Sequence, residues 1–126
     1  MLVPRVMAGV RHFRELVCWQ LSREKLALYR FAENLHVKRD VRFYCQLRDA
    51  AVSAPRNIAE GFARRTHAEF AHYLDVARGS LDEYQNHLHG AVDRGDLTPE
   101  ELTSMNTLAE RACVAVARFQ RDLRGR

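Results

Sequence analysis

Apolar residues recur along most of the chain at alternating steps of three and four, the spacing of one face of an α-helix. Residues 70–91 and 102–123 keep this spacing without interruption, and residues 17–35 and 44–62 show shorter versions of it. The period-two alternation of β-strands is nearly absent, and no Asn-Gly or Asp-Gly pair marks a hairpin turn. The pattern therefore predicts four helices. Their expected core positions are Val17, Leu21, Leu28, Phe31 and Leu35, then Tyr44, Leu47, Ala51, Ala54, Ile58 and Phe62, then Phe70, Leu74, Ala77, Leu81, Tyr84, Leu88 and Ala91, and finally Leu102, Met105, Ala109, Ala112, Val116, Phe119 and Leu123.

Two helix starts carry clear signals. Thr66 is followed three residues later by Glu69, which is the spacing of a capping box. Thr98 precedes Pro99 and Glu101, so an N-cap, a proline at the first helical position and a glutamate at the third stand in order. Pro55 lies inside the second apolar pattern, which stays in phase on both sides of it. We expect a kink there within one helix rather than a break into two.

The predicted links, near residues 36–39, 63–66 and 92–98, are short. Short links between long helices place sequential helices antiparallel. The expected fold is therefore all-α, an up-down-up-down antiparallel four-helix bundle formed by residues 11–126, with residues 1–10 as a loose N-terminal arm. A turn centred near residues 64 and 65 would place Ala50 level with Gly79 and Gln46 level with Glu83. Two small residues at one level predict close approach of the helices at Gly79.

Composition narrows the class of protein. The chain has 126 residues, of which 47% are apolar and 29% charged, an ordinary balance for one globular domain. No apolar run approaches the length of a membrane span. The three cysteines, Cys18, Cys45 and Cys113, are far apart and match neither a disulfide framework nor a zinc site. We expect reduced thiols and a cytoplasmic protein.

Three segments carry a family resemblance. Residues 46–65 read QLRDAAVSAPRNIAEGFARR, residues 77–83 read ARGSLDE and residues 11–20 read RHFRELVCWQ. Together they resemble the bacterial four-helix proteins encoded in intervening sequences of large-subunit ribosomal RNA genes. The resemblance implies a four-helix bundle that assembles into a homopentameric ring. It also implies kinship with the accessory variability protein of diversity-generating retroelements, which works with a reverse transcriptase and binds nucleic acid. The intervening-sequence family itself has no established activity to transfer.

Within the central motif, a polar stripe follows one side of the second helix. Its members Ser53, Asn57, Glu60 and Arg64 are spaced at steps of four, three and four, beside the apolar face. Such a stripe serves as a hydrogen-bond network between helices, as a subunit or partner interface, or least often as a catalytic site. With the polar groups expected nearby, the candidate structural or interface residues are Gln46, Arg48, Ser53, Asn57, Glu60, Gly79, Ser80 and Glu83. Their levels suggest a contact of Glu83 with Gln46 or Arg48.

Catalytic chemistry finds little support. Glu33-x-x-His36 and Glu69-x-x-His72 resemble halves of a di-iron site, but they lie at opposite ends of parallel helices. Ser53, Ser80 and Cys45 have no histidine at their level to activate them. Phosphate-binding glycine loops are absent. We therefore expect no enzyme activity, no metal and no cofactor.

Charge is distributed unevenly. The chain carries a net charge of +4, and residues 1–14, 64–65 and 111–126 are rich in arginine, whereas residues 93–110 are acidic. The expected topology brings the three basic segments to one end, the basic pole. Its candidate nucleic-acid-binding residues are Arg11, Arg14, Arg64, Arg65, Arg118, Arg121 and Arg124. No aromatic platform for bases is apparent among them, so any binding should be electrostatic and tolerant of sequence.

Two functions are consistent with this charge pattern. The first is a non-enzymatic oligomeric adaptor that binds RNA or DNA through the basic pole, beside a nucleic-acid enzyme. The alternative is a protein-only scaffold, in which the arginines are solvated or dock on the acidic end of a neighbouring copy.

Overall fold

The computed structural model describes residues 9–24 and 41–124. They form a short 3₁₀-helix, η2 (Phe13–Glu15), and four α-helices, α1 (Val17–Glu24), α4 (Val41–Phe62), α5 (His67–Asp93) and α6 (Pro99–Arg124). Within these ranges there is no strand, and the all-α prediction is confirmed. The predicted arm up to residue 8, the link at 36–39, the second half of the first helix and the Glu33-x-x-His36 motif lie outside the described residues.

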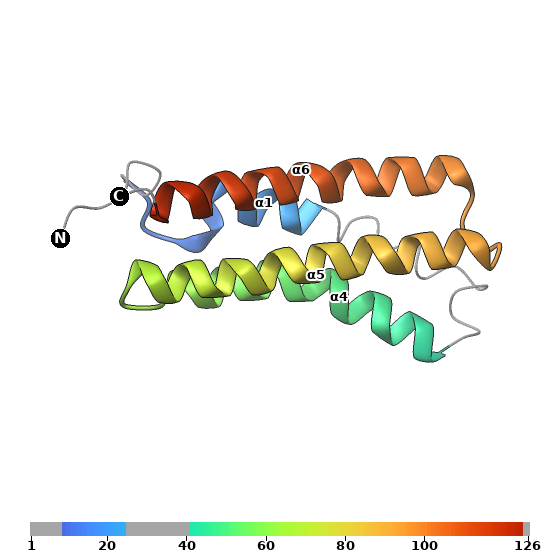
Figure 1. The fold of residues 1–126 in the computed structure, drawn as a ribbon, viewed down its shortest axis with the longest axis horizontal. Helices are drawn as coiled ribbons and strands as arrows, with labels where there is room; N and C mark the ends of the chain where they lie inside the picture. The colour runs from blue at the N-terminus through green and yellow to red at the C-terminus, as the bar shows by residue number, and fades with distance from the viewer. Residues whose placement is uncertain (1–8, 25–40, 125–126) are drawn as a thin grey trace.

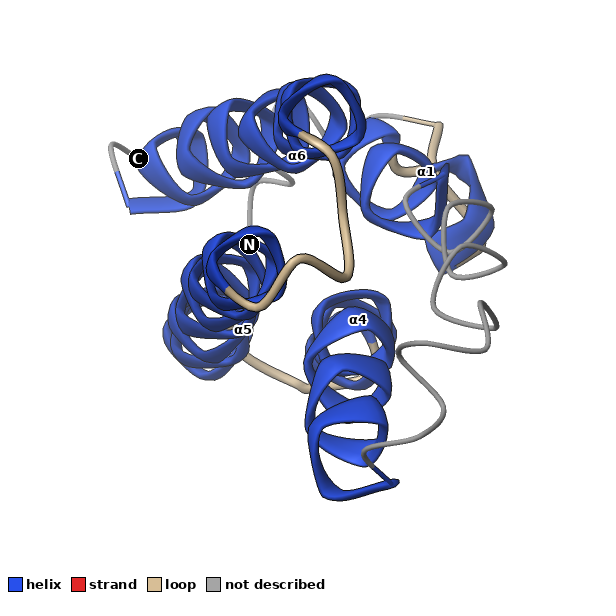
Figure 2. Ribbon diagram, turned by 90° about the vertical axis from the view of Figure 1, so that its right-hand side faces the viewer, coloured by secondary structure: helices blue, strands red, loops and turns tan. Residues whose placement is uncertain are grey.

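The helices run alternately up and down, as predicted. Figure 1 shows α1 and α5 running in one direction and α4 and α6 in the other. Viewed end-on in Figure 2, the four helices surround a common centre. Within this arrangement α5 packs against α4 and α6, and α1 packs against the same two helices. The up-down-up-down antiparallel bundle is therefore confirmed.

Helix boundaries follow the predicted capping signals. The Thr66 hydroxyl accepts a hydrogen bond from the backbone N–H of Glu69 at 3.1 Å, but the Glu69 carboxylate does not accept one from Thr66 N–H, so only half of the predicted capping box is formed. The Thr98 hydroxyl accepts from Glu101 N–H at 3.1 Å, and the Glu101 carboxylate accepts from Thr98 N–H at 3.0 Å. Each bond satisfies a backbone donor that the first helical turn leaves without a partner. α4 continues through Pro55, and Figure 1 shows its axis bending, in agreement with the predicted kink.

The core consists of two apolar clusters along the bundle. One lies toward the end that holds η2 and the last turns of α6, and it includes Leu16, Ile58, Leu74, Val116 and Leu123. The other lies toward the α5–α6 turn and includes Phe43, Tyr84, Leu88, Leu97 and Met105. Every predicted core position of α5 is buried, and so is every one of α6 except Leu102, which is half-buried.

The predicted core face of the first helix is wrong at Val17, which is 62% exposed. Leu16, Cys18 and Ser22 are buried instead. The reason is the 3₁₀ turn that precedes the helix: Leu16 has extended backbone and points into the core before α1 begins. The buried face of α1 is therefore displaced from the face that the apolar spacing suggested.

The predicted close approach at Gly79 is also wrong. A Cβ atom built on Gly79 would meet nothing within 4 Å, and the residue is exposed. The close approach of α4 to α5 is at Gly61 instead, where an added Cβ would lie 2.7 Å from Tyr73 Cβ and 2.8 Å from Phe70 Cδ1. In the observed register of the two helices Ser53 faces Ser80, so the expected level pairs are displaced.

Candidate functional site

The fold brings the described parts of the three basic segments together, as the topology predicted. In Figure 1, η2, the turn between α4 and α5 and the last turns of α6 lie at the same end of the bundle. The turn between α5 and α6, with its acidic residues, lies at the opposite end. All seven candidate arginines are exposed: Arg11, Arg14, Arg64, Arg65, Arg118, Arg121 and Arg124. The basic pole is therefore an accessible surface assembled from three distant segments of the chain.

The first of these segments is held in a defined shape. The Glu15 carboxylate accepts hydrogen bonds from the backbone N–H groups of Arg11 at 2.7 Å and His12 at 3.3 Å. Gln20, on α1, donates from its side chain to the Arg14 carbonyl oxygen at 3.0 Å. These bonds join η2 to its flanking residues and to α1, so the arginines of this segment project from a fixed turn.

Two arginines of the pole pair with acidic side chains. Arg64 contacts Glu60 at 3.0 Å and also lies over the ring of Tyr73, 4.8 Å from its centroid. Arg124 contacts Asp75 at 3.0 Å. All four ionic side chains are at least 39% exposed, and ion pairs at such exposure contribute little stability. An incoming phosphate could replace these carboxylates at small cost.

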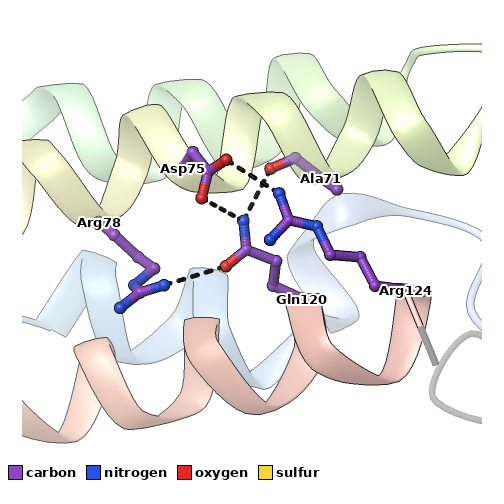
Figure 3. A network of polar contacts seen from close by, with 5 residues as sticks. All are labelled: Ala71, Asp75, Arg78, Gln120 and Arg124. Atoms are coloured by element: carbon purple, nitrogen blue, oxygen red, sulfur yellow. Dashed lines mark hydrogen bonds and ion pairs between the residues drawn. The ribbon is translucent and has the colours of Figure 1, made fainter.

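A polar network behind Arg124 was not predicted. Figure 3 shows Gln120 of α6 between two groups of α5: its amide donates to the Ala71 carbonyl at 2.9 Å and to Asp75 at 2.6 Å. The Gln120 oxygen accepts from Arg78 at 3.2 Å. The hydrogen bond from Gln120, followed by the Arg124 contact, lowers the pKa of Asp75 below its ordinary 3.8. One sign in the sequence indicated that Gln120 links α6 to α5, namely its position next to the core residue Phe119.

A groove runs between α1 and α6 beside the same end. It has a volume of about 1140 Å³, and Val17, Leu21 and Val114 are among its apolar lining residues. Arg118 and Arg121 of the basic pole also line it, together with Arg111, Glu110 and Asp122. This part of the pole therefore combines cationic side chains with an exposed apolar strip, which the sequence pattern did not reveal.

Two members of the polar stripe on α4, Ser53 and Asn57, take part in a hydrogen-bond network between helices, whereas Glu60 and Arg64 pair with each other on the surface of α4. Asn57 donates to the Ser53 hydroxyl at 3.0 Å, and the Ser53 and Ser80 hydroxyls are 2.6 Å apart. Ser80 donates onward to the Val76 carbonyl at 3.0 Å. The donors can thus run in one direction from α4 into the backbone of α5. Both Asn57 and Ser80 are buried, so the network stabilises the contact between these helices.

The remaining motif residues do not meet as expected. Glu83 contacts His87, one turn further along α5, at 3.4 Å. Arg48 contacts its neighbour Asp49 at 3.7 Å. The predicted contact of Glu83 with Gln46 or Arg48 is therefore not formed. The prediction assumed that α4 and α5 pair symmetrically about residues 64 and 65, and the observed register of the two helices differs from that. Gln46 is exposed.

The remaining candidate chemical groups are those that could hold a metal or act as nucleophiles. Across residues 9–24 and 41–124, no cluster of three or more His, Cys, Asp or Glu side chains is placed to bind a metal ion. Glu69 and His72 are exposed on the first turns of α5. Burial raises the pKa of the Cys18 thiol to about 12, which makes it a poor nucleophile. None of the described helices is long and apolar enough to cross a membrane.

Comparison with known proteins identifies the family. Residues 14–117 match the family described as 23S rRNA-intervening sequence protein. The chain belongs to this family. The match extends from η2 through most of α6 and confirms the resemblance of the central motif. No curated protein matches the chain.

A solved structure shows the same fold. It is the crystal structure of a protein of unknown function from the S23 ribosomal protein family of Bacteroides thetaiotaomicron VPI-5482. It superposes with a TM-score of 0.73 at 20% sequence identity, covering 82% of this chain and 97% of that one. Neither this structure nor the matched family is described by a catalytic activity, so the comparisons support the fold and the family but assign no reaction.

Proposed function

We propose that this intervening-sequence family member is a non-enzymatic homo-oligomer, a pentamer, that binds RNA or DNA through the basic pole and acts as an adaptor beside a nucleic-acid enzyme. The observation that carries the proposal is the gathering of seven exposed arginines from three segments at one end of the bundle. The pentamer and the enzyme partner come from the family resemblance of the central motif. A cyclic oligomer would repeat the same pole in every subunit.

The chemistry of the pole suits a phosphate backbone. Guanidinium groups bind phosphate oxygens through two parallel hydrogen bonds and stay charged at any physiological pH. The acidic residues Asp93, Glu100 and Glu101 lie at the far end, where they repel a polyanion and direct it toward the pole. Binding of this kind is electrostatic, so it should weaken steeply with salt.

The test is a binding titration of a labelled structured RNA and a labelled DNA duplex across a salt series. We expect affinity to fall at least about tenfold between about 50 and 200 mM salt. The double variant Arg118→Glu/Arg121→Glu should reduce affinity at low salt by about tenfold or more. The matched control is Arg42→Glu/Arg48→Glu, which makes the same charge change at exposed positions of α4 away from the pole. Equal loss in both variants, or binding that is indifferent to salt, would contradict the proposal.

A second candidate function is a protein-only scaffold. It is favoured by Val17 and Val114, which are 62% and 51% exposed and both line the groove between α1 and α6. Exposed apolar strips of this kind mark protein interfaces. Absence of binding to either nucleic acid at low salt would favour the scaffold. The mass of the native particle, from light scattering, tests the pentamer in either case.

A further inference from the structure

Aromatic rings and arginines alternate at the start of the bundle. The ring centroids of His12 and Phe13 are 4.4 Å apart, and those of Phe13 and Trp19 are 5.3 Å apart. The Arg14 guanidinium lies 6.0 Å from the centroid of the Phe13 ring, and that of Arg23 lies 5.9 Å from the Trp19 ring. Aromatic rings therefore lie beside arginines next to the basic pole, an arrangement that the sequence analysis did not anticipate. The cluster was missed because Trp19 and Arg23 come from α1, whereas the other residues precede it.

The cluster is partly exposed and packs against the core. His12, Phe13 and Trp19 are half-buried, and Arg14 and Arg23 are exposed. Phe13 and Trp19 pack against the core from its edge, which fixes the orientation of the rings. The Arg14 side chain also contacts the His12 ring, with Nε 3.1 Å from Nδ1. A ligand that stacks on these rings would therefore meet a surface that needs little ordering.

We propose that this cluster stacks the unpaired bases of a single-stranded nucleic acid while Arg14 and Arg23 bind the flanking phosphates. Rings beside arginines at a positively charged surface are the combination by which proteins hold single strands, because every base has a stacking face whereas the bases of a duplex are covered by their neighbours. This inference rests on the proposed function and adds to it a preference for single-stranded over duplex nucleic acid. The pole alone attracts any polyanion, and the aromatic cluster selects strands with exposed bases.

Trp19 is the only tryptophan in the chain, so its fluorescence reports on the cluster directly. The protein is titrated at low salt with a single strand of about 12 nucleotides, as RNA and as DNA, with the matched duplex, and with an abasic strand of equal length. We expect both single strands to quench Trp19 fluorescence. The duplex and the abasic strand, which present phosphates without accessible bases, should bind without comparable quenching.

Variants extend the test, with binding measured by anisotropy of the labelled strand. Trp19→Leu should weaken single-strand binding about fivefold or more and leave duplex binding unchanged, whereas Trp19→Phe, which keeps a ring, should restore most of the affinity. Tyr44→Leu is the matched control, since Tyr44 is a half-buried aromatic residue near the other end of the bundle. If Trp19→Leu does not fold, two measurements still decide the question. They are the quenching of Trp19 fluorescence in the unaltered protein and the single-strand affinity of Arg23→Ala, a substitution at an exposed residue.

The outcomes separate the two proposals. Salt-dependent binding of single strand, abasic strand and duplex with equal affinity and no quenching would overturn the stacking site but leave the basic pole as the binding surface. Failure of every nucleic acid to bind at low salt would overturn both. Quenching by base-bearing single strands alone, lost in Trp19→Leu and kept in Tyr44→Leu, would establish the stacking site.

Discussion

Gln120 and Asp75 are joined by a hydrogen bond of 2.6 Å that connects α6 to α5 beside the basic pole. Gln120 is only 2% exposed, whereas the Asp75 side chain is 49% exposed and also contacts Arg124. The network therefore reaches from the interior of the bundle to its charged surface. It fixes the last turns of α6, where Arg118, Arg121 and Arg124 of the pole are located.

The buried amide should be important for stability. Gln120→Ala removes the hydrogen bonds to Ala71 and Asp75 and leaves an unfilled volume, so we expect it to lower the free energy of unfolding by about 2–3 kcal/mol. Urea unfolding at a fixed protein concentration measures the change. Gln46→Ala is the control, because Gln46 is exposed and its loss should change stability by no more than about 0.5 kcal/mol. Equal effects of the two substitutions would refute the role assigned to the network.

Asp75 should contribute to the pH dependence of stability. Its pKa is lowered in the folded protein, so its stabilising effect is fully present above the ordinary value of 3.8 and is lost as pH falls through the lower folded value. Asp75→Asn cannot titrate. We therefore expect the unaltered protein to lose more stability than Asp75→Asn as pH falls below about 4. Urea midpoints measured along an acid series test this, and parallel curves for the two proteins would contradict it.

The parts of the structure that the sequence predicted are those with local signals. The cores of α5 and α6 follow uninterrupted steps of three and four, and Thr66 and Thr98 begin helices through bonds within four residues. Contacts between helices were harder to predict, because they depend on the register in which two helices pair. α4 and α5 approach each other closely at Gly61 and pair Ser53 with Ser80, so the level pairs inferred from the turn between them are not formed. The aromatic cluster at Trp19 and the Gln120 network depend on side chains from separate elements, which periodicity does not relate.

The two glycines of the α4–α5 pair should respond to alanine in opposite ways. At Gly61 the new Cβ would lie 2.7 Å from Tyr73 Cβ, so the helices must separate, and we expect a loss of about 2 kcal/mol or more. At Gly79 the Cβ would meet nothing within 4 Å, and alanine should stabilise the exposed helix by about 0.5–1 kcal/mol. Thermal unfolding of the two variants checks both signs. A loss of stability in Gly79→Ala would show that this position is covered in the assembled protein.

Two buried serines allow the stability cost of a hydroxyl without a hydrogen-bond partner to be measured against that of a bonded one. Ser22 on α1 is 0% exposed, and its hydroxyl has no hydrogen-bond partner among the described residues. Ser80 on α5 is 7% exposed and bonds both Ser53 and the Val76 carbonyl. Alanine improves helix propensity similarly at both sites, so the difference between the variants isolates the hydroxyl groups.

Ser22→Ala should raise the free energy of unfolding by about 1 kcal/mol, because it removes a polar group that is buried at a cost. Ser80→Ala should lower it by about 1 kcal/mol, because Ser53 loses its partner across the helix pair. Both values come from urea unfolding at equal protein concentration, since assembly of subunits would add to the apparent stability. Destabilisation by Ser22→Ala would mean that this hydroxyl has a partner in the folded protein. In that case α1 would make a further polar contact through Ser22, at the start of the bundle next to Trp19 and the basic pole.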